Sequence, residues 1–124
     1  MGKWMIVLGA VSGFVSVAAG AFGAHALKAR LAPDLLVIFE TGARYQMYHA
    51  LALVLIGVFS LVRPSPLLDG AGYAMLAGTL LFSGSLYVLA LTDTRWLGAV
   101  TPFGGVAFLV GWGLCAVAAL KIGP

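Results

Sequence analysis

The positions of the charged residues constrain this chain more than any other feature of its sequence. The Lys, Arg, Asp and Glu side chains leave four long intervals without a formal charge, of 24, 18, 23 and 25 residues. A helix that crosses the hydrocarbon core of a bilayer needs about 20 mostly apolar residues. Backbone N–H and C=O groups cannot stay unpaired in lipid, so each interval predicts one spanning helix. The expected spans are residues 4–24, 45–62, 70–91 and 96–120.

The composition excludes the other classes of protein. Hydrophobic residues make up 62% of the chain and charged residues 9%, against roughly a quarter charged in globular domains. So few charges cannot cover a water-facing surface, and so apolar a chain does not stay disordered in water. The basic residues are scattered, which argues against a nucleic-acid partner. We therefore expect an all-α membrane protein with one integral membrane domain, residues 1–124, folded as an antiparallel bundle of four transmembrane helices.

The segment between the first two spans is longer than a tight turn requires. Pro33 suits the first position of a helix, and Asp34 favours the positive end of the helix dipole. Apolar residues then recur at helical spacing, at Leu35, Ile38, Phe39 and Gly42. This pattern predicts a short amphipathic helix over about 33–43 that lies in the membrane interface and runs into the second span, with a bend at Gly42.

Small residues and one proline lead to expectations about helix packing. Gly9 and Gly13 form a GxxxG pattern, which allows two helices to approach closely where no hydrophobic effect drives association. The main expected use is packing within one bundle, and packing between two copies of the chain is the alternative. Pro102 lies six residues into the expected fourth span and predicts a kink there.

Polar side chains gather toward one end when the four helices are laid out antiparallel. The loops at this end are residues 25–44 and 92–95, and the opposite half of the membrane contains little besides Ala, Val, Leu and Gly. A binding site, if the protein has one, is therefore expected here. Its candidate residues are His25, Glu40, Arg44, Tyr45, Gln46, Tyr48, His49 and Tyr87.

Two features of this set carry alternative interpretations. Glu40 and Arg44 have the i, i+4 spacing of a helical ion pair, which either neutralises two charges or handles a ligand or proton. His25 and His49 on adjacent helices could ligate a haem or metal, but no second His pair or carboxylate cluster accompanies them. Hydrogen bonding of His49 to a neighbouring helix or carbonyl is the favoured expectation, and a pH response is the alternative.

Nothing in the sequence points to catalysis. Cys115 stands alone in an apolar segment and is expected to pack rather than react. No Ser-His-Asp set, P-loop or dinucleotide fingerprint is present. We expect no enzymatic activity, no cofactor and no metal.

Four strings of residues are specific enough to show a resemblance. They are Gly20-Ala-Phe-Gly-Ala-His-Ala-Leu27, Phe39-Glu-Thr-Gly-Ala-Arg-Tyr-Gln-Met-Tyr-His49, Leu81-Phe-Ser-Gly-Ser-Leu-Tyr87 and Leu97-Gly-Ala-Val-Thr-Pro-Phe-Gly-Gly105. With these strings the chain resembles the YgdD/YwdK-like family of small four-span inner-membrane proteins of unknown function. The resemblance covers essentially the whole chain and implies a multi-pass protein of the bacterial inner (plasma) membrane. It implies no activity and no catalytic residues.

The leading hypothesis is a non-enzymatic helical bundle that binds a lipid, a quinone-like molecule or a partner protein at its polar end. The expected partners are membrane lipids, with another membrane protein or a second copy of the chain as further candidates. The alternative is a small-solute or proton-coupled transporter that acts as an oligomer. It would use Glu40 and His49 for coupling, and Pro102, Gly104 and Gly105 as a flexible element.

Overall fold

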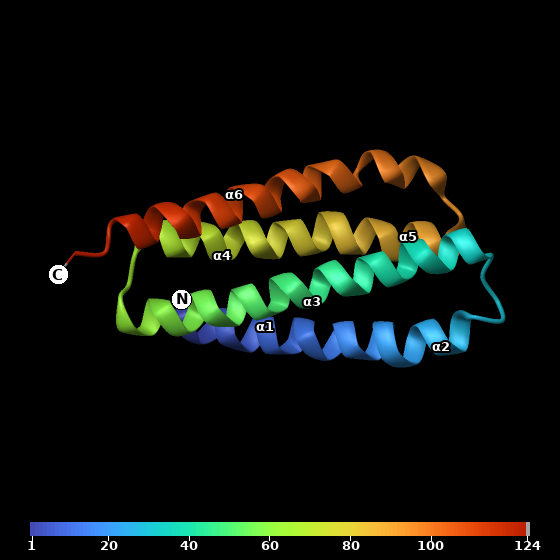
Figure 1. Ribbon diagram of the computed structural model, residues 1–124, viewed down its shortest axis with the longest axis horizontal. Coiled ribbons are helices and arrows are strands. Elements are labelled where there is room, and N and C mark those ends of the chain that lie inside the picture. Colours follow the sequence, from blue (N-terminus) through green and yellow to red (C-terminus); the bar gives the residue numbers. More distant parts are fainter. Residues whose placement is uncertain (124) are drawn as a thin grey trace.

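The computed structural model describes residues 1–123 and consists of four long antiparallel helical rods joined by short loops (Figure 1). Within these residues the rods are built from six α-helices, two π-helical turns and one 3₁₀ turn. In chain order these are α1 (Gly2–Val17), η1 (Ala18–Gly23), α2 (Ala24–Leu27), α3 (Pro33–Val62), α4 (Pro66–Gly78), η2 (Thr79–Ser83), α5 (Gly84–Thr92), η3 (Arg95–Ala99) and α6 (Thr101–Leu120).

The four rods agree with the four predicted spans. They run over Gly2–Leu27, Pro33–Val62, Pro66–Thr92 and Arg95–Leu120, and each is long and apolar enough to cross a membrane. Their 26 to 30 residues correspond to roughly 39–45 Å of helix at 1.5 Å per residue. Each rod therefore extends beyond a hydrocarbon core of about 30 Å.

The segment expected as an interfacial helix that runs into the second span is the beginning of α3. The helix starts at Pro33 and continues without interruption to Val62, so residues 33–43 and the second span form one rod. Leu35, Phe39 and Gly42 are buried, which agrees with the apolar side that their spacing predicts. Gly42 does not interrupt the helix: a Cβ there would lie 3.1 Å from the ring of Tyr87, so glycine makes room for that ring.

Pro102 of the fourth span, where a kink was expected, does not lie in the interior of an α-helix. Pro102 lies in the first turn of α6, where its missing N–H leaves no hydrogen bond unmade. The residues before it form the 3₁₀ turn η3. The proline thus marks the start of an α-helix rather than a break within one.

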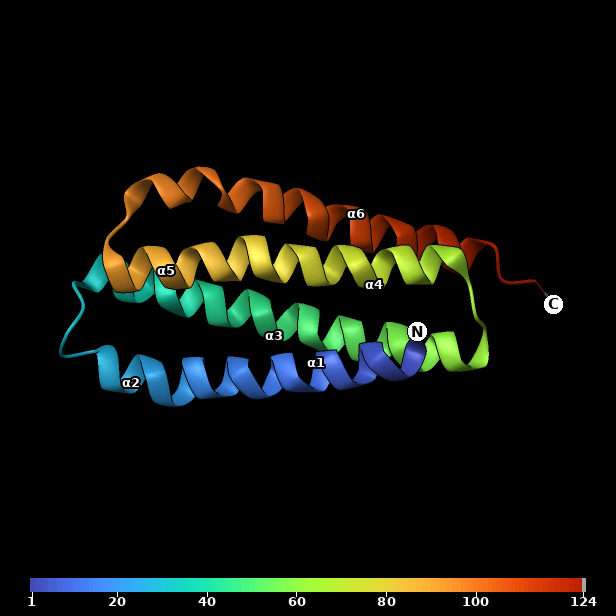
Figure 2. The same ribbon diagram turned by 180° about the vertical axis from the view of Figure 1, so that it is seen from behind.

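The rods associate as two close pairs, α1 with α3 and α4 with α6, and α3 packs against α4 and α5 to join the pairs. Glycine permits each close approach. A Cβ on Gly9 of α1 would lie 2.9 Å from the carbonyl oxygen of Ala50 in α3. A Cβ on Gly104 of α6 would lie 2.3 Å from the backbone nitrogen of Phe82 in η2. Figures 1 and 2 show the resulting order α1, α3, α4/α5, α6, with α1 and α6 on the outside.

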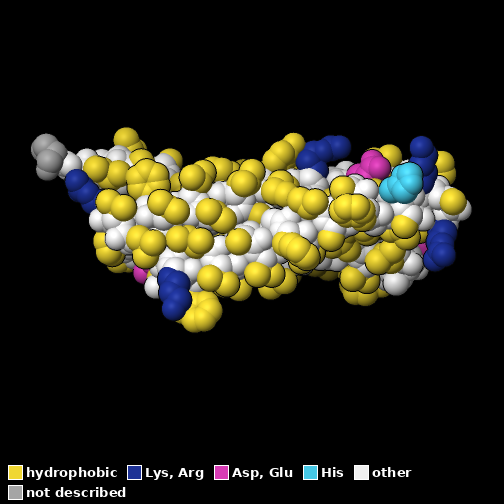
Figure 3. All heavy atoms as spheres, turned by 90° about the horizontal axis from the view of Figure 1, so that it is seen from below, with side chains coloured by type: hydrophobic (Ala, Val, Ile, Leu, Met, Phe, Trp, Pro, Cys, Tyr) yellow, Lys and Arg dark blue, Asp and Glu magenta, His cyan; other side chains and the backbone are white. Residues whose placement is uncertain are grey.

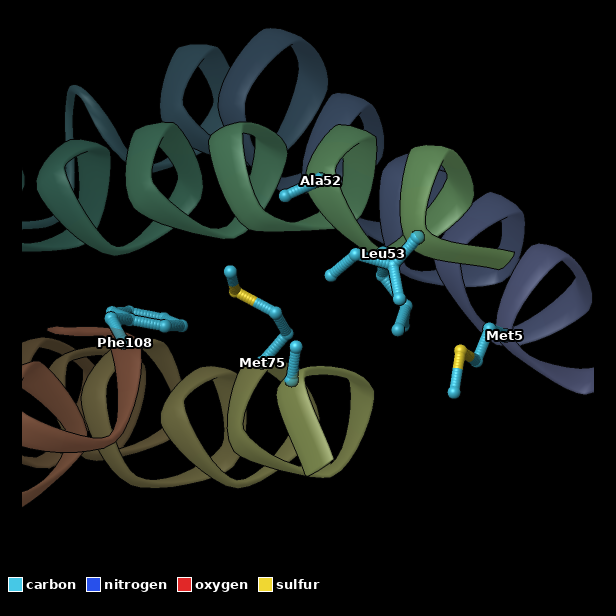
Figure 4. Packing of buried hydrophobic residues seen from close by; sticks show 7 residues of the cluster. Met5, Ala52, Leu53, Met75 and Phe108 are labelled. Carbon is cyan, nitrogen blue, oxygen red and sulfur yellow. The ribbon is translucent and has the colours of Figure 1, made fainter. Parts of the chain in front are cut away.

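The apolar core lies between the two pairs. Leu53 of α3 faces Met75 of α4, and Met5 and Phe108 reach in from the outer helices (Figure 4). All four side chains are at most 4% exposed.

The exterior is apolar. The buried share of the most apolar part differs between the rods. It is only 17% in the first rod and 22% in the fourth, against 44% in α3. On the face that Figure 3 shows, hydrophobic side chains cover the length of the molecule and basic side chains lie mostly toward its two ends. This surface suits hydrocarbon along the sides and lipid headgroups at the ends.

The Gly104 contact leads to a stability prediction. Gly104→Ala places a methyl group against the Phe82 backbone, which cannot yield as a flexible side chain would. We expect the free energy of unfolding to fall by about 3 kcal/mol, measured by titration with sodium dodecyl sulfate and circular dichroism. Gly113→Ala is the matched control in α6, because nothing lies within 4 Å of a Cβ there. It should be neutral or stabilising by up to about 1 kcal/mol, and equal stabilities for the two variants would contradict the packing described.

Candidate functional site

The buried amide of Gln46 ties three rods together. Its Nε2 donates to Ser12 Oγ of α1 at 3.2 Å, and its Oε1 accepts from the hydroxyl of Tyr87 in α5 at 2.6 Å. Two of the predicted site residues, Gln46 and Tyr87, are therefore direct partners. Their hydrogen bonds connect helices of this chain to each other.

Two serines extend this connection through backbone carbonyls of α3. Ser16 Oγ donates to the carbonyl of Ala43 at 2.7 Å, and Ser83 Oγ donates to the carbonyl of Gly42 at 2.7 Å. Both serines are buried. We call Ser12, Ser16, Gln46, Ser83 and Tyr87 the polar layer. Of these five residues the sequence predicted Gln46 and Tyr87 as candidates. The signal for the three serines is that a serine within a span is also a hydrogen-bond donor.

His49 has a partner on each ring nitrogen. Nε2 lies 3.1 Å from Trp112 Nε1 of α6, and Nδ1 lies 2.7 Å from the carbonyl oxygen of Tyr45. An indole N–H can only donate and a carbonyl can only accept, so this arrangement requires the neutral imidazole with its proton on Nδ1. The ring also stacks on Phe108, with centroids 3.5 Å apart.

This geometry confirms the expectation that His49 hydrogen bonds to a neighbouring helix and a carbonyl. Neither ring nitrogen is left free to ligate a haem or a metal in this arrangement. His25, the other histidine, is exposed in α2. His49 lies 16 residues after the start of α3 and 13 before its end, which places it roughly midway along the rod.

The remaining predicted residues lie on the outside. Glu40, Arg44 and Tyr48 are exposed along one side of α3. Tyr45 is 38% exposed, and its ring contacts those of Tyr48 and Phe82, with centroids 5.6 and 4.8 Å away. The predicted residues thus form a buried Gln46–Tyr87 contact, a His49–Tyr45 contact and an exposed strip rather than one enclosed pocket.

The expected ion pair between Glu40 and Arg44 is not formed. Among residues 1–123 the ion pairs are those of Arg95, which contacts Asp34 at 2.9 Å and also Asp93. Glu40 and Arg44 are both exposed. Arg95 instead connects the loop before η3 to the first turn of α3, a contact between distant segments that spacing could not predict.

Two adjoining cavities follow the seam between α3 and α6, and Trp112 lines both. We call them together the α3–α6 groove. Its end cavity, of about 450 Å³, lies where α3 ends and α4 begins and is lined by Ala52, Leu55, Ile56, Phe59, Arg63, Pro64, Ser65, Pro66, Leu68, Trp112, Cys115, Ala118, Ala119, Lys121 and Ile122. Its middle cavity, of about 370 Å³, is lined by Tyr45, Tyr48, His49, Phe82, Gly105, Phe108, Leu109 and Trp112.

The groove exists because α3 and α6 are not close neighbours: each packs tightly on a different partner. Of the residues predicted from sequence, only Tyr45, Tyr48 and His49 line it. Its chemistry is apolar and aromatic along most of its length, with Arg63 and Lys121 at the end cavity.

The four rods, their apolar exterior and the glycine contacts between them define a multi-pass, all-helical integral membrane protein. Comparison with known proteins then identifies the family. A family model described as "Protein of unknown function (DUF423)" matches residues 19–105. The chain belongs to this family of uncharacterised membrane proteins.

Relatives match over nearly their whole length. A UPF0382 membrane protein of Staphylococcus epidermidis is 46% identical over 119 residues, which cover 96% of this chain and 97% of the relative. The UPF0382 membrane protein YwdK of Bacillus subtilis is 45% identical over 125 residues, covering 96% and 98%. The resemblance to the YgdD/YwdK-like family is thereby confirmed, and the location is the plasma membrane, which the chain crosses several times. No solved structure matches the chain.

The Gln46–Tyr87 hydrogen bond can be tested by a double-mutant cycle. Tyr87→Phe leaves the buried Oε1 of Gln46 without its donor, and we expect the free energy of unfolding to fall by about 1 kcal/mol. In a Gln46→Leu background the same substitution should cost much less. Tyr73→Phe is the control, because the hydroxyl of Tyr73 contacts only the sulfur of Met1 in an exposed position. Equal losses from Tyr87→Phe in both backgrounds would show that the contact is not made.

Proposed function

We propose that the protein is a non-enzymatic binding protein that holds one lipid-like molecule, a lipid or a quinone, in the α3–α6 groove. The observation that carries the proposal is the pair of adjoining cavities that share Trp112. Their volumes, about 450 and 370 Å³, fall within the roughly 300–1,000 Å³ of small-molecule sites.

The lining of the groove supports an apolar occupant that enters from the bilayer. Leu55 and Phe59 of α3 and Leu109 of α6 line it and are more than half exposed. In the membrane this exposed side faces hydrocarbon, so a lipid chain or an isoprenoid tail reaches the groove without crossing water. The ring of Phe82, which lines the middle cavity, offers aromatic surface for packing.

The hydrogen bonds of His49 support binding rather than catalysis. Both ring nitrogens are engaged, so the imidazole has no free lone pair with which to accept a proton from a substrate. The hydrogen bonds of the polar layer likewise have both their donor and their acceptor within the chain.

Transport has less support than binding. Gly104 is packed against the backbone of Phe82, which opposes movement of α6 about this glycine. Pro102 starts α6 rather than interrupting it. Glu40 is exposed while His49 is buried, so the two groups do not share a coupling site.

A pair of substitutions in α6 tests the proposal. Gly105→Phe puts a large ring into the middle cavity, where a Cβ has as its nearest neighbour the Phe82 ring at 4.0 Å. Gly113→Phe makes the same change where the surroundings are open. The readout is lipid or quinone retained on the gently extracted protein, measured by native mass spectrometry.

We expect Gly105→Phe to lower retention of the bound molecule roughly tenfold, the equivalent of about 1.4 kcal/mol of lost contacts, and Gly113→Phe to leave it unchanged. Circular dichroism should show the same helix content in both variants. Retention that is equal in the two variants, or absent from the parent protein, would rule out binding in the groove.

A further inference from the structure

We infer that the molecule in the groove is an anionic phospholipid, with its phosphate between Arg63 and Lys121 and an acyl chain along the end cavity toward Trp112. The inference rests on the proposed binding function and specifies its ligand class. Three features of the end cavity support this inference: the charges in its lining, its length along the helices, and the loop at its mouth.

The end cavity has two cationic side chains in its lining and no acidic one. Arg63 follows the last residue of α3 and Lys121 the last residue of α6. Neither forms an ion pair with a carboxylate among residues 1–123, whereas Arg95 at the other end of the molecule contacts two. Two unpaired cations at the mouth of an apolar cavity are the arrangement by which basic pockets between spanning helices recognise anionic headgroups.

The length of the end cavity matches one leaflet of a bilayer. Along α6 it extends from Lys121 to Trp112, nine residues or about 14 Å of helix. Along α3 it extends from Arg63 to Ala52, eleven residues or about 17 Å. Half of a hydrocarbon core of about 30 Å is about 15 Å. A phospholipid whose phosphate lies at the two cations therefore has its acyl chain reach Trp112, and the terminal carbons of the chain continue into the middle cavity, which Trp112 also lines.

The loop at the mouth is held in place by its own sequence. Pro64 and Pro66 fix two backbone angles, and Ser65 Oγ accepts a hydrogen bond from the backbone N–H of Leu67 at the start of α4. A mouth held in this way loses little freedom when a headgroup binds, which favours affinity.

The same features disfavour a quinone at this end. A quinone headgroup carries no formal charge, so it would leave Arg63 and Lys121 without a counter-charge. The walls between the cations and Trp112 are aliphatic and small apart from Phe59, with Leu55, Cys115 and Ala119 among them. A flexible chain fits such walls better than a planar ring does.

The experiment uses the full chain in nanodiscs made from equal amounts of phosphatidylglycerol and phosphatidylcholine, followed by release and native mass spectrometry of the retained lipid. Arg63→Gln and Lys121→Gln each remove one cation from the end cavity. Lys3→Gln is the matched control, because the first rod begins at this end of the molecule and Lys3 does not line the cavity. Ala119→Phe fills the cavity, and Ala116→Phe makes the same change outside its lining.

We expect the parent protein to retain phosphatidylglycerol in preference to phosphatidylcholine. Each cation contributes about 1 kcal/mol. The preference for phosphatidylglycerol over phosphatidylcholine should therefore fall about fivefold in each single variant and about 25-fold in the double variant. Ala119→Phe should remove both lipids from the complex, while Lys3→Gln and Ala116→Phe should match the parent.

Three outcomes would overturn the inference. Equal retention of the two lipids by the parent protein, with loss of both in Ala119→Phe, would leave binding in the groove intact and reject the anionic headgroup. A loss in Lys3→Gln as large as in Arg63→Gln would show general attraction to the protein surface instead of a site. Retention of neither lipid, together with no effect of Gly105→Phe on any bound molecule, would reject the proposed function as well.

Discussion

The rest of the structure depends on close backbone contact between helices at glycine. In a bilayer the lipid tails are as apolar as the helix surfaces, so burial of apolar area contributes little to association and contact distance decides which helices pair. Gly9 brings α1 against α3, and Gly104 brings the fourth rod against the third. Two close pairs result, and the contact between them through α3, α4 and α5 leaves α3 and α6 apart. The groove is a direct consequence of that pairing.

Hydrogen bonds between the rods add specificity to this arrangement, and they engage most of the buried polar side chains that the structure describes. Gln46 and the serines of the polar layer bond to other rods, and His49 bonds to Trp112 across the groove. A buried donor without a partner is costly in lipid, so these residues are explained by structure alone. In the end cavity, what remains for a ligand is apolar surface and the two cations Arg63 and Lys121. This remainder suits an amphiphile with a charged head and explains why the proposed function involves no bond-making step.

The fold could be predicted from the sequence to the extent that exclusion of charge from hydrocarbon determines it. The four charge-free intervals identified four spans, because no other arrangement keeps the backbone paired in lipid. The continuation of residues 33–43 into the second span was also predicted. The role of Pro102 could not be predicted this way, because it depends on where an α-helix starts, and Pro102 lies in the first turn of α6. The i, i+4 spacing predicted an ion pair between Glu40 and Arg44, but the exposed ion pair that forms is that of Arg95 with Asp34, 61 positions away in the sequence. The groove could not be predicted from the sequence. It forms between two rods that are not close neighbours, and no local pattern of residues shows which rods those are.

The central claim is that α3 and α6 meet through the side chains of His49, Phe108 and Trp112 and leave a groove open to lipid along the rest of their seam. A high-resolution structure determined in a bilayer that contains phosphatidylglycerol tests it most directly. The account predicts elongated lipid density between α3 and α6, with its phosphate beside Arg63 and Lys121 and its chain passing Trp112 into the middle cavity. A structure in which α6 lies directly against α3 and side chains of the protein fill this space would contradict it.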